Sequence, residues 1–214
     1  MGADRPKQFL MLDGEEVIAH SIIAFDQSPC IDEVAIVVHP DWLDHVEQLV
    51  RSHDWCKVHK IIPGGSERYL SSVNAIKAYS AYPDDTNIIL HDAARPWISQ
   101  KVIERVALSL VDNEAVAVGV PSTDTVWQID PASQTIQQIP LRNTMWRAQT
   151  PQAFRLSLIR RAYDLALADP RLQVSDDCGV LMRYLPEYPI TIVEGEESNK
   201  KITFKGDIPC MSSD

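Results

Sequence analysis

Short apolar runs alternate with amphipathic stretches along most of the chain, and this alternation constrains the fold more than any other feature of the sequence. Continuous runs of β-branched and other apolar residues are typical of strands that are covered on both faces of a sheet. Apolar positions three and four residues apart are typical of helices with one buried face. The alternation therefore predicts an α/β fold with three layers and a mostly parallel sheet.

The predicted elements follow from these two patterns. The predicted strands are the apolar runs at 34–38, 58–62, 88–90, 115–120 and 190–193. The predicted helices are the segments with helical spacing at 42–52, 67–81, 101–111, 156–168 and 176–185. Ser175 is the expected N-cap of the last helix. Since the 214 residues contain no internal repeat and no long linker, one domain is expected over residues 1–214.

The period changes over residues 124–142. Thr125, Trp127 and Ile129 occupy alternate positions before the turn residues Asp130 and Pro131. Alternation on both sides of a turn predicts a β-hairpin inserted in the α/β chain. Because a two-stranded ribbon is only marginally stable in water, we expect this arm to pack on something else, a second subunit being one candidate.

Charge and hydropathy argue against two classes of partner. The sequence has 30 Asp and Glu against 20 Lys and Arg, a formal net charge of −10. Such a field disfavours DNA and RNA. No run approaches the roughly 18 apolar residues of a membrane helix, and the start MGADRPKQF has no apolar signal segment. We expect a cytoplasmic protein without a nucleic-acid or membrane partner.

The cysteines give no sign of a metal or redox centre, and the six histidines show no metal-ligand spacing. Cys30, Cys56, Cys178 and Cys210 are far apart and form no CxxC pair. This spacing suggests neither a disulfide framework nor a zinc site, and we expect reduced thiols. No GxSxG motif is present, so hydrolase chemistry has little support.

The segment LHDAARPWI places Asp92 at the carboxyl end of a predicted central strand, the edge where open α/β sheets bind ligands. A carboxylate there can hold Mg²⁺ against phosphates, and Arg95 can clamp a phosphate through its planar fork. The alternative is that Asp92 caps a turn and forms a surface ion pair with Arg95. The residues alone leave both interpretations open.

Two other segments offer anion-binding groups. Gly64 and Gly65 precede a predicted helix, with Ser71 one turn inside it, although two glycines before a helix often form only a turn. Lys7, Lys200 and Lys201 could build a local positive pocket, or could be solvated surface lysines.

The acidic pair Asp176 and Asp177 could ligate a metal. Acids at a helix start also stabilise the helix dipole without any ligand, and we favour that second interpretation.

Seven motifs, taken in order, resemble one family. They are PKQF from Pro6, GGSER from Gly64, HDAARP from His91, the pair DT at Asp124, LRNTMWRAQTPQAF from Leu141, SDD from Ser175 and SNKKIT from Ser198. Together they resemble the 2-C-methyl-D-erythritol 4-phosphate cytidylyltransferases of the non-mevalonate isoprenoid pathway. The ribitol-5-phosphate cytidylyltransferases carry similar motifs. The resemblance implies a Rossmann-like nucleotidyltransferase fold with a β-hairpin dimerisation arm, and a homodimer that joins CTP to a polyol phosphate with Mg²⁺.

The resemblance also implies roles for individual residues. Catalytic roles fall on Lys7, Lys201 and Asp92, with Asp92 also the expected metal ligand. The residues expected to bind the nucleotide are Lys7, Gly64, Gly65, Ser71, Asp92 and Ala93. Those expected to bind the polyol phosphate are Arg95, Thr125, Arg142, Thr150 and Lys201. Thr125 and Arg142 lie on the arm, so they are expected to serve the partner's site.

The sequence departs from the family pattern at its start. Family members open with a β-strand and a glycine-rich loop, and here Met1 and Gly2 stand where that loop ends. We therefore expect a chain that starts at Met1 to bind the triphosphate weakly. Two alternatives to the methylerythritol phosphate enzyme stay open: a ribitol-5-phosphate cytidylyltransferase, and a catalytically impaired dimeric binding protein.

Overall fold

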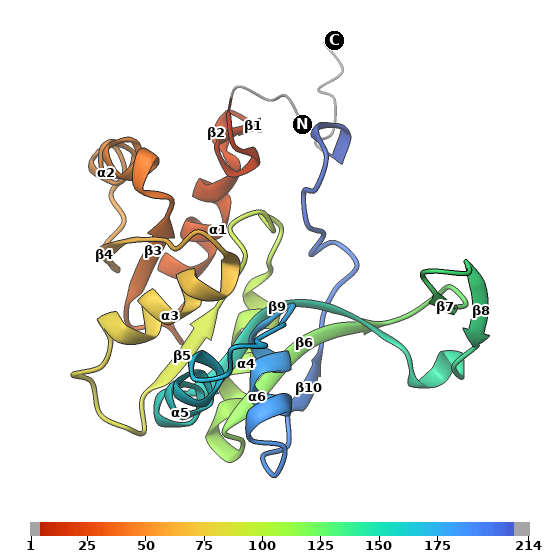
Figure 1. The fold of residues 1–214 in the computed structure, drawn as a ribbon. Coiled ribbons are helices and arrows are strands. Elements are labelled where there is room, and N and C mark those ends of the chain that lie inside the picture. The colour runs from red at the N-terminus through yellow and green to blue at the C-terminus, as the bar shows by residue number, and fades with distance from the viewer. Residues whose placement is uncertain (1–4, 208–214) are drawn as a thin grey trace.

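The computed structural model describes residues 5–207, which form layers of strands and helices with one hairpin standing away from the body (Figure 1). The larger sheet has the strand order β10–β6–β9–β5. Its strands are β5 (Asn87–Leu90), β6 (Ala115–Pro121), β9 (Trp146–Arg155) and β10 (Thr191–Glu194). A separate parallel pair is formed by β3 (Val34–Val38) and β4 (Val58–Pro63).

The five predicted strands and five predicted helices are confirmed. The helices are α2 (Leu43–Arg51), α3 (Arg68–Ala78), α4 (Gln100–Asp112), α5 (Leu156–Leu167) and α6 (Asp177–Tyr184). The prediction that Ser175 caps α6 is wrong. The Asp176 side chain accepts a hydrogen bond from the Gly179 amide at 2.8 Å, so the cap is one residue later than expected. Aspartate is as good an N-cap as serine, and pattern alone does not separate adjacent candidates.

The sheet is less parallel than predicted. Strands β6 and β10 are parallel, but β9 lies between β5 and β6 and is antiparallel to both. No strand was predicted at Trp146–Arg155, because its sequence WRAQTPQAFR is neither a continuous apolar run nor a clean alternation. The polar side chains of Gln149, Thr150 and Gln152 are nevertheless buried, because they find hydrogen-bond partners inside the fold.

Helix α1 (Val17–Asp26) was not predicted either. Its sequence VIAHSIIAFD is apolar on most sides, and its buried residues include Val17, Ile18, Ala19, Ile22 and Phe25. A helix that is covered on several sides lacks the one-sided periodicity that identifies an amphipathic helix.

The remaining elements are short. Strands β1 (Met11–Leu12) and β2 (Glu15–Glu16) form a tight hairpin whose turn residues, Asp13 and Gly14, have φ of 49° and 90°. Positive φ at both central residues is what a type I′ hairpin turn requires. The 3₁₀ helices are η1 (Lys7–Phe9), η2 (Pro40–Trp42), η3 (Arg142–Thr144) and η4 (Lys205–Asp207).

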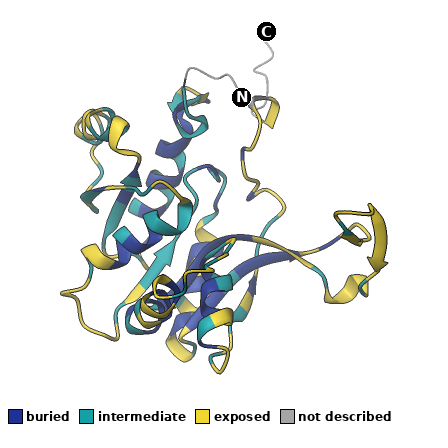
Figure 2. Ribbon diagram, viewed as in Figure 1, coloured by how far each residue is buried: buried dark blue, intermediate teal, exposed yellow. Residues whose placement is uncertain are grey.

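The core lies on both faces of the larger sheet, and most residues of its strands β6 and β9 are buried (Figure 2). Phe154 faces α3, α5 and α6, whereas its neighbour Ala153 faces α1 and α4. A third cluster joins α1 and α2 to β3, with Phe9 stacked on Trp42 at a centroid distance of 4.6 Å. Helices on both faces of the strands confirm the predicted three-layer α/β class.

The predicted hairpin is confirmed as β7 (Gln128–Asp130) paired with β8 (Thr135–Gln138). It stands away from the body at the end of two extended connections (Figure 1). Its large apolar side chains are exposed: Val126, Trp127, Ile129, Ile136, Ile139 and Leu141. The arm therefore adds nothing to the hydrophobic core of its own chain.

Within residues 5–207, no helix has both the length and the apolar character needed to cross a bilayer. Cys30, Cys56 and Cys178 are free thiols, and Cys210 lies outside the described residues.

The burial of Phe154 predicts a large effect on stability. Phe154 is 0% exposed, so Phe154→Ala should lower the free energy of unfolding by about 3–5 kcal/mol through lost burial and a residual cavity. Chemical denaturation measures this difference. Leu165→Ala, at a residue 44% exposed on α5, is the control and should cost under about 1 kcal/mol. Equal losses in the two variants would contradict the assignment of Phe154 to the core.

Candidate functional site

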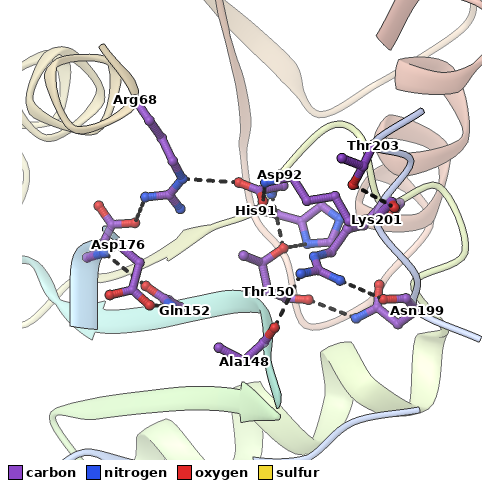
Figure 3. A network of polar contacts seen from close by, with 12 residues as sticks. Arg68, His91, Asp92, Ala148, Thr150, Gln152, Asp176, Asn199, Lys201 and Thr203 are labelled. Atoms are coloured by element: carbon purple, nitrogen blue, oxygen red, sulfur yellow. Dashed lines mark hydrogen bonds and ion pairs between the residues drawn. The ribbon is translucent and has the colours of Figure 1, made fainter. Parts of the chain in front are cut away.

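Asp92, directly after β5, is the centre of the main polar cluster (Figure 3). Its Oδ2 accepts from the Lys201 ammonium at 2.6 Å, and its Oδ1 accepts from Arg68 Nε at 3.3 Å. Its backbone amide donates to Thr150 Oγ1 on β9 at 3.1 Å. The carboxylate is thus fixed between two cations just beyond the carboxyl end of β5, as predicted, but β5 is an edge strand of the four-stranded sheet and the prediction of a central strand is wrong.

The charges of this cluster perturb one another. Burial disfavours the charged form of Asp92, but Lys201 and Arg68 outweigh it and hold the pKa of the carboxyl below its ordinary value. Burial and the Lys201 cation lower the pKa of Lys7, with Asp92 acting in the opposite direction. The charge of Asp92 thus acts on two lysines that are nearly 200 positions apart in the chain, Lys7 and Lys201.

Arg68 connects Asp92 to the interior. Its Nη1 lies 2.8 Å from Oδ2 of Asp177, whose side chain is fully buried. Asp177 Oδ1 accepts from the Tyr163 hydroxyl at 2.6 Å, and its backbone amide donates to Gln152 Oε1 at 3.1 Å. Burial disfavours the Arg68 cation, but the two carboxylates outweigh it and raise its pKa. Asp177 is therefore the buried ion-pair partner of Arg68.

Arg95 does not pair with Asp92, so the interpretation of the two as a surface ion pair is wrong. Arg95 Nη1 donates to the Asn199 carbonyl at 2.9 Å, and Nη2 donates to the Ala148 carbonyl at 3.4 Å. Its Nε is buried and has no hydrogen-bond partner. An arginine whose partners are neutral carbonyls keeps a charge that an anion can neutralise.

His91 supports the turn that carries Asp92 and Arg95. Its Nε2 lies 3.2 Å from the Arg95 carbonyl, which can only accept, so Nε2 carries the proton. Its Nδ1 is left to accept from the Thr150 hydroxyl at 3.1 Å. Burial lowers the pKa of His91 to about 4, so the ring is neutral near pH 7.

The glycine pair allows α3 to approach β4 closely. A Cβ on Gly65 would lie 2.2 Å from the Leu70 Cβ, and one on Gly64 would lie 3.3 Å from the Val38 carbonyl oxygen. The Gly65 amide donates to Ser71 Oγ at 3.1 Å. The three residues that the sequence placed at the nucleotide side are thus brought together beside the start of α3.

The remaining predicted residues fall into two places. Ala93 and Thr150 lie in the Asp92 cluster, where the Ala93 carbonyl faces the Ser21 hydroxyl at 3.5 Å. Thr125 and Arg142 lie together at the base of the arm, with Arg142 Nη2 3.4 Å from Thr125 Oγ1. Among the described residues, no hydrogen bond joins this arm pair to the Asp92 cluster of the same chain.

Comparison with known proteins agrees with this geometry. The family model described as 2-C-methyl-D-erythritol 4-phosphate cytidylyltransferase matches residues 1–212. The chain belongs to this family. The cytidylyltransferases are nucleotidyltransferases, so the predicted enzyme class is confirmed.

Individual relatives give the same picture. The chain is 43% identical to the 2-C-methyl-D-erythritol 4-phosphate cytidylyltransferase of Thermobifida fusca, with 97% of this chain and 85% of that protein covered. It is 29% identical to the ribitol-5-phosphate cytidylyltransferase of Lactiplantibacillus plantarum, with 97% and 89% covered. The solved 4-diphosphocytidyl-2C-methyl-D-erythritol synthase of Anaerococcus prevotii superposes with a TM-score of 0.87 at 28% identity, covering 97% and 88%. The Rossmann-like nucleotidyltransferase fold is thereby confirmed.

The donor set in this cytidylyltransferase suits a magnesium ion shared with phosphates. No group of three or more His, Cys, Asp or Glu that could hold a metal occurs in the described part of the chain. Mg²⁺ bound with substrate phosphates commonly takes only one or two carboxylates, the other ligands being water and phosphate oxygens. Asp92 provides one such carboxylate, and its charged state is stabilised by Lys201 and Arg68. The residues present therefore fit a one-carboxylate site.

Several residues of the cluster were not among the predicted site residues: Arg68, His91, Gln152, Asp177 and Asn199. Arg68 and His91 belong to the GGSER and HDAARP motifs, so these motifs could have identified both residues as site residues. Nothing in the sequence indicates that Arg68 contacts a residue 109 positions away.

The neutral His91 predicts a specific dependence of stability on pH. Its native pKa of about 4 lies below the ordinary 6.5, so between these values the unfolded chain binds a proton that the native protein does not. The free energy of unfolding should fall as pH is lowered through this window, by up to about 3 kcal/mol. Urea titrations without divalent ions or nucleotide measure it.

In His91→Gln this contribution should disappear, because glutamine does not titrate. His59→Gln, at an exposed histidine, is the control and should keep the slope of the parent. The same slope in His91→Gln and parent would contradict a buried neutral imidazole.

Proposed function

We propose that this chain transfers the cytidylyl group of CTP to 2-C-methyl-D-erythritol 4-phosphate, releasing pyrophosphate and CDP-methylerythritol for isoprenoid precursor synthesis. One observation carries the proposal: in a protein with a net charge of −10, Lys201 and Arg68 both contact Asp92 just beyond the carboxyl end of β5. A local positive site in a negative protein suits two phosphorylated substrates. The 43% identity to the Thermobifida fusca enzyme supports this choice of substrate.

The transfer reaction requires that the two substrates are aligned and that the negative charge of their phosphates is neutralised. A phosphate monoester is already an anionic nucleophile, so its attack on the α-phosphorus of CTP needs no strong general base. Lys7 and Lys201 lie where they would stabilise negative charge on the reacting phosphates. Arg95, whose buried Nε has no partner, would orient the attacking phosphate.

The nucleoside end would lie against the glycine pair. Gly64 and Gly65 let this turn pass close to β3 and α3, and Ser71 Oγ accepts the hydrogen bond of the Gly65 amide, which holds the turn in place. Ala93 and Thr150 would frame the other side of the pocket. Asp92 would hold Mg²⁺, which when bound supplies further positive charge to the triphosphate.

The arm suggests a homodimer. Thr125 and Arg142 lie on a hairpin that stands away from the body, so they would bind the polyol phosphate in the partner's site (Figure 1). The exposed apolar side chains of the arm would be covered by that partner. We place this dimer in the cytoplasm.

A second candidate substrate is ribitol 5-phosphate. The Lactiplantibacillus plantarum relative supports it, with 29% identity over nearly the whole chain. The two polyol phosphates differ only in the polyol, so a few contacts decide between them. Pyrophosphate release measured with each substrate at equal concentration separates the two candidates, and we expect preference for the methylerythritol phosphate.

The proposed role of Asp92 predicts the effect of a nearly isosteric change. Asp92→Asn removes the charge that faces Lys201 and Mg²⁺, so kcat/KM for pyrophosphate release should fall at least about 100-fold. Asp85→Asn, at an exposed loop residue remote from the cluster, should keep parental turnover. Parental kcat/KM in a folded Asp92→Asn variant at saturating Mg²⁺ would show that the carboxylate has no such role.

The proposed sharing of sites between subunits predicts complementation. Mixing inactive Arg142→Ala and Asp92→Asn subunits gives heterodimers in which one site combines a normal body with a normal arm. After full exchange, activity should recover to about a quarter of the parent value. Steady-state pyrophosphate release, with exchange verified by differently tagged subunits, measures it. If well-mixed heterodimers stay inactive, each site is built from a single chain.

A further inference from the structure

Asp177, the first residue of α6, has a carboxylate that is completely buried, with a side chain 0% exposed. In the part of the chain that the structure describes, Arg68 is its only ion-pair partner. A buried carboxylate that loses its counter-ion strongly destabilises a protein. Asp177 therefore requires the Arg68 guanidinium beside it.

Asp177 itself is held in place by α5 and β9. Its Oδ1 accepts from the Tyr163 hydroxyl of α5 at 2.6 Å, and its backbone amide donates to Gln152 Oε1 of β9 at 3.1 Å. The Cys178 amide donates to the same oxygen at 3.1 Å. Tyr163 and Gln152 are each 2% exposed, so the surrounding core restricts their movement. The Asp177 carboxylate is thus a fixed point in the interior.

Arg68 divides its guanidinium between two carboxylates. Its Nη1 donates to Asp177 Oδ2 at 2.8 Å, whereas its Nε donates to Asp92 Oδ1 at 3.3 Å. Figure 3 shows Arg68 between Asp92 and the segment that carries Asp176. Because the guanidinium is a rigid planar fork, the atom held by Asp177 determines where Nε can lie. The shorter contact, to the interior, therefore sets the geometry of the longer one.

These contacts close a ring around the end of β5. Gln152 is the register partner of Leu90, the last residue of β5, and Asp92 follows two positions later. Asp92 is thus connected to β9 by its own strand and also by the side chains of Arg68 and Asp177. The strand fixes where the Asp92 main chain lies. The side-chain route fixes the direction of one carboxylate oxygen.

The charges of this ring balance in pairs. Lys201 Nζ lies 2.6 Å from Asp92 Oδ2, and Arg68 pairs with Asp177, so each carboxylate has a cation of its own. Without the charge of Asp177, Arg68 would keep Asp92 as its only carboxylate partner. The guanidinium would then be free to turn, and the Asp92 carboxylate would lose its single orientation.

We propose that Asp177 is a positioning residue for the cytidylyl transfer: acting through Arg68, it holds the Asp92 carboxylate in one orientation at the reaction site. Asp177 cannot touch a substrate itself, because its side chain is fully buried. Groups that orient a functional carboxylate commonly contribute about 10- to 100-fold to activity. This inference rests on the proposed function, which gives Asp92 its role.

Nuclear magnetic resonance tests the link in the free protein, without substrate or metal. The Nε–H of Arg68 donates to Asp92, and its exchange with water reports how firmly the guanidinium is held. Asp177→Asn should speed this exchange at least about tenfold, because the other end of the guanidinium is released. Tyr163→Phe keeps the charge of Asp177 and removes one hydrogen bond to it, so it should give a smaller increase. Arg68→Lys, which lacks this proton, identifies the signal.

Pyrophosphate release tests whether Asp177 acts through Asp92. In the parent background, Asp177→Asn should lower kcat/KM about 10- to 100-fold. In an Asp92→Asn background, the same change should cost less than about threefold, because the carboxylate to be oriented is no longer there. A residue that only stabilised the fold would give the same ratio in both backgrounds. Thermal melting verifies that each variant is folded.

Asp169 offers a matched control. Its Oδ2 also contacts an arginine and a tyrosine, with Arg183 Nη2 and the Tyr184 hydroxyl both at 2.8 Å. Among the contacts of the described residues, none joins Asp169 to Asp92 or Arg68. Asp169→Asn removes a comparable set of contacts, and it should keep parental kcat/KM and parental Arg68 exchange.

Three results would overturn the proposal. The first is unchanged Arg68 Nε–H exchange in a folded Asp177→Asn variant. The second is an equal loss of kcat/KM in the parent and Asp92→Asn backgrounds. The third is the same loss in Asp169→Asn as in Asp177→Asn, which would indicate general destabilisation. A parent chain without turnover would contradict the proposed function instead, and the exchange measurement would then decide alone whether Asp177 fixes Arg68.

Discussion

The carboxylate of Asp92, held between Lys201 and Arg68, is the interaction on which the site depends. It joins three segments that are far apart in the chain: the end of β5, the first turn of α3 and the segment after β10. Lys201 and Arg68 would repel each other without this carboxylate, because each contacts one of its two oxygens. One buried negative charge lets these cations share a site before any phosphate arrives, so the binding charge is preorganised.

The sequence predicts those elements whose residues follow one simple period. The continuous apolar run of β3 and the one-sided apolar spacing of α4 are such cases. Helix α1 and strand β9 are not. The first is covered on several sides, and the second buries polar side chains such as Gln152, which is satisfied only by contacts made after folding. Periodicity cannot report a pattern that the tertiary structure creates.

The candidate site also has some residues that the sequence predicts and others that only the structure reveals. Asp92, Arg95 and Lys201 can be found from their place after a strand or in a basic motif, because local sequence fixes the strand and its edge. The Arg68 to Asp177 ion pair cannot, because it joins two helices that only the complete fold brings together. Sequence motifs therefore locate the charges, whereas the structure shows which of them neutralise one another.

Gly65 links backbone sterics to this balance of charges. Any side chain there would press on Leu70, since even a Cβ would come within 2.2 Å of the Leu70 Cβ. The first turn of α3 would have to shift, and Arg68 is on that turn. A movement of Arg68 would leave the fully buried Asp177 with a weaker counter-ion. The need to neutralise the buried Asp177 carboxylate therefore restricts which residues can replace Gly65, although Gly65 itself carries no charge.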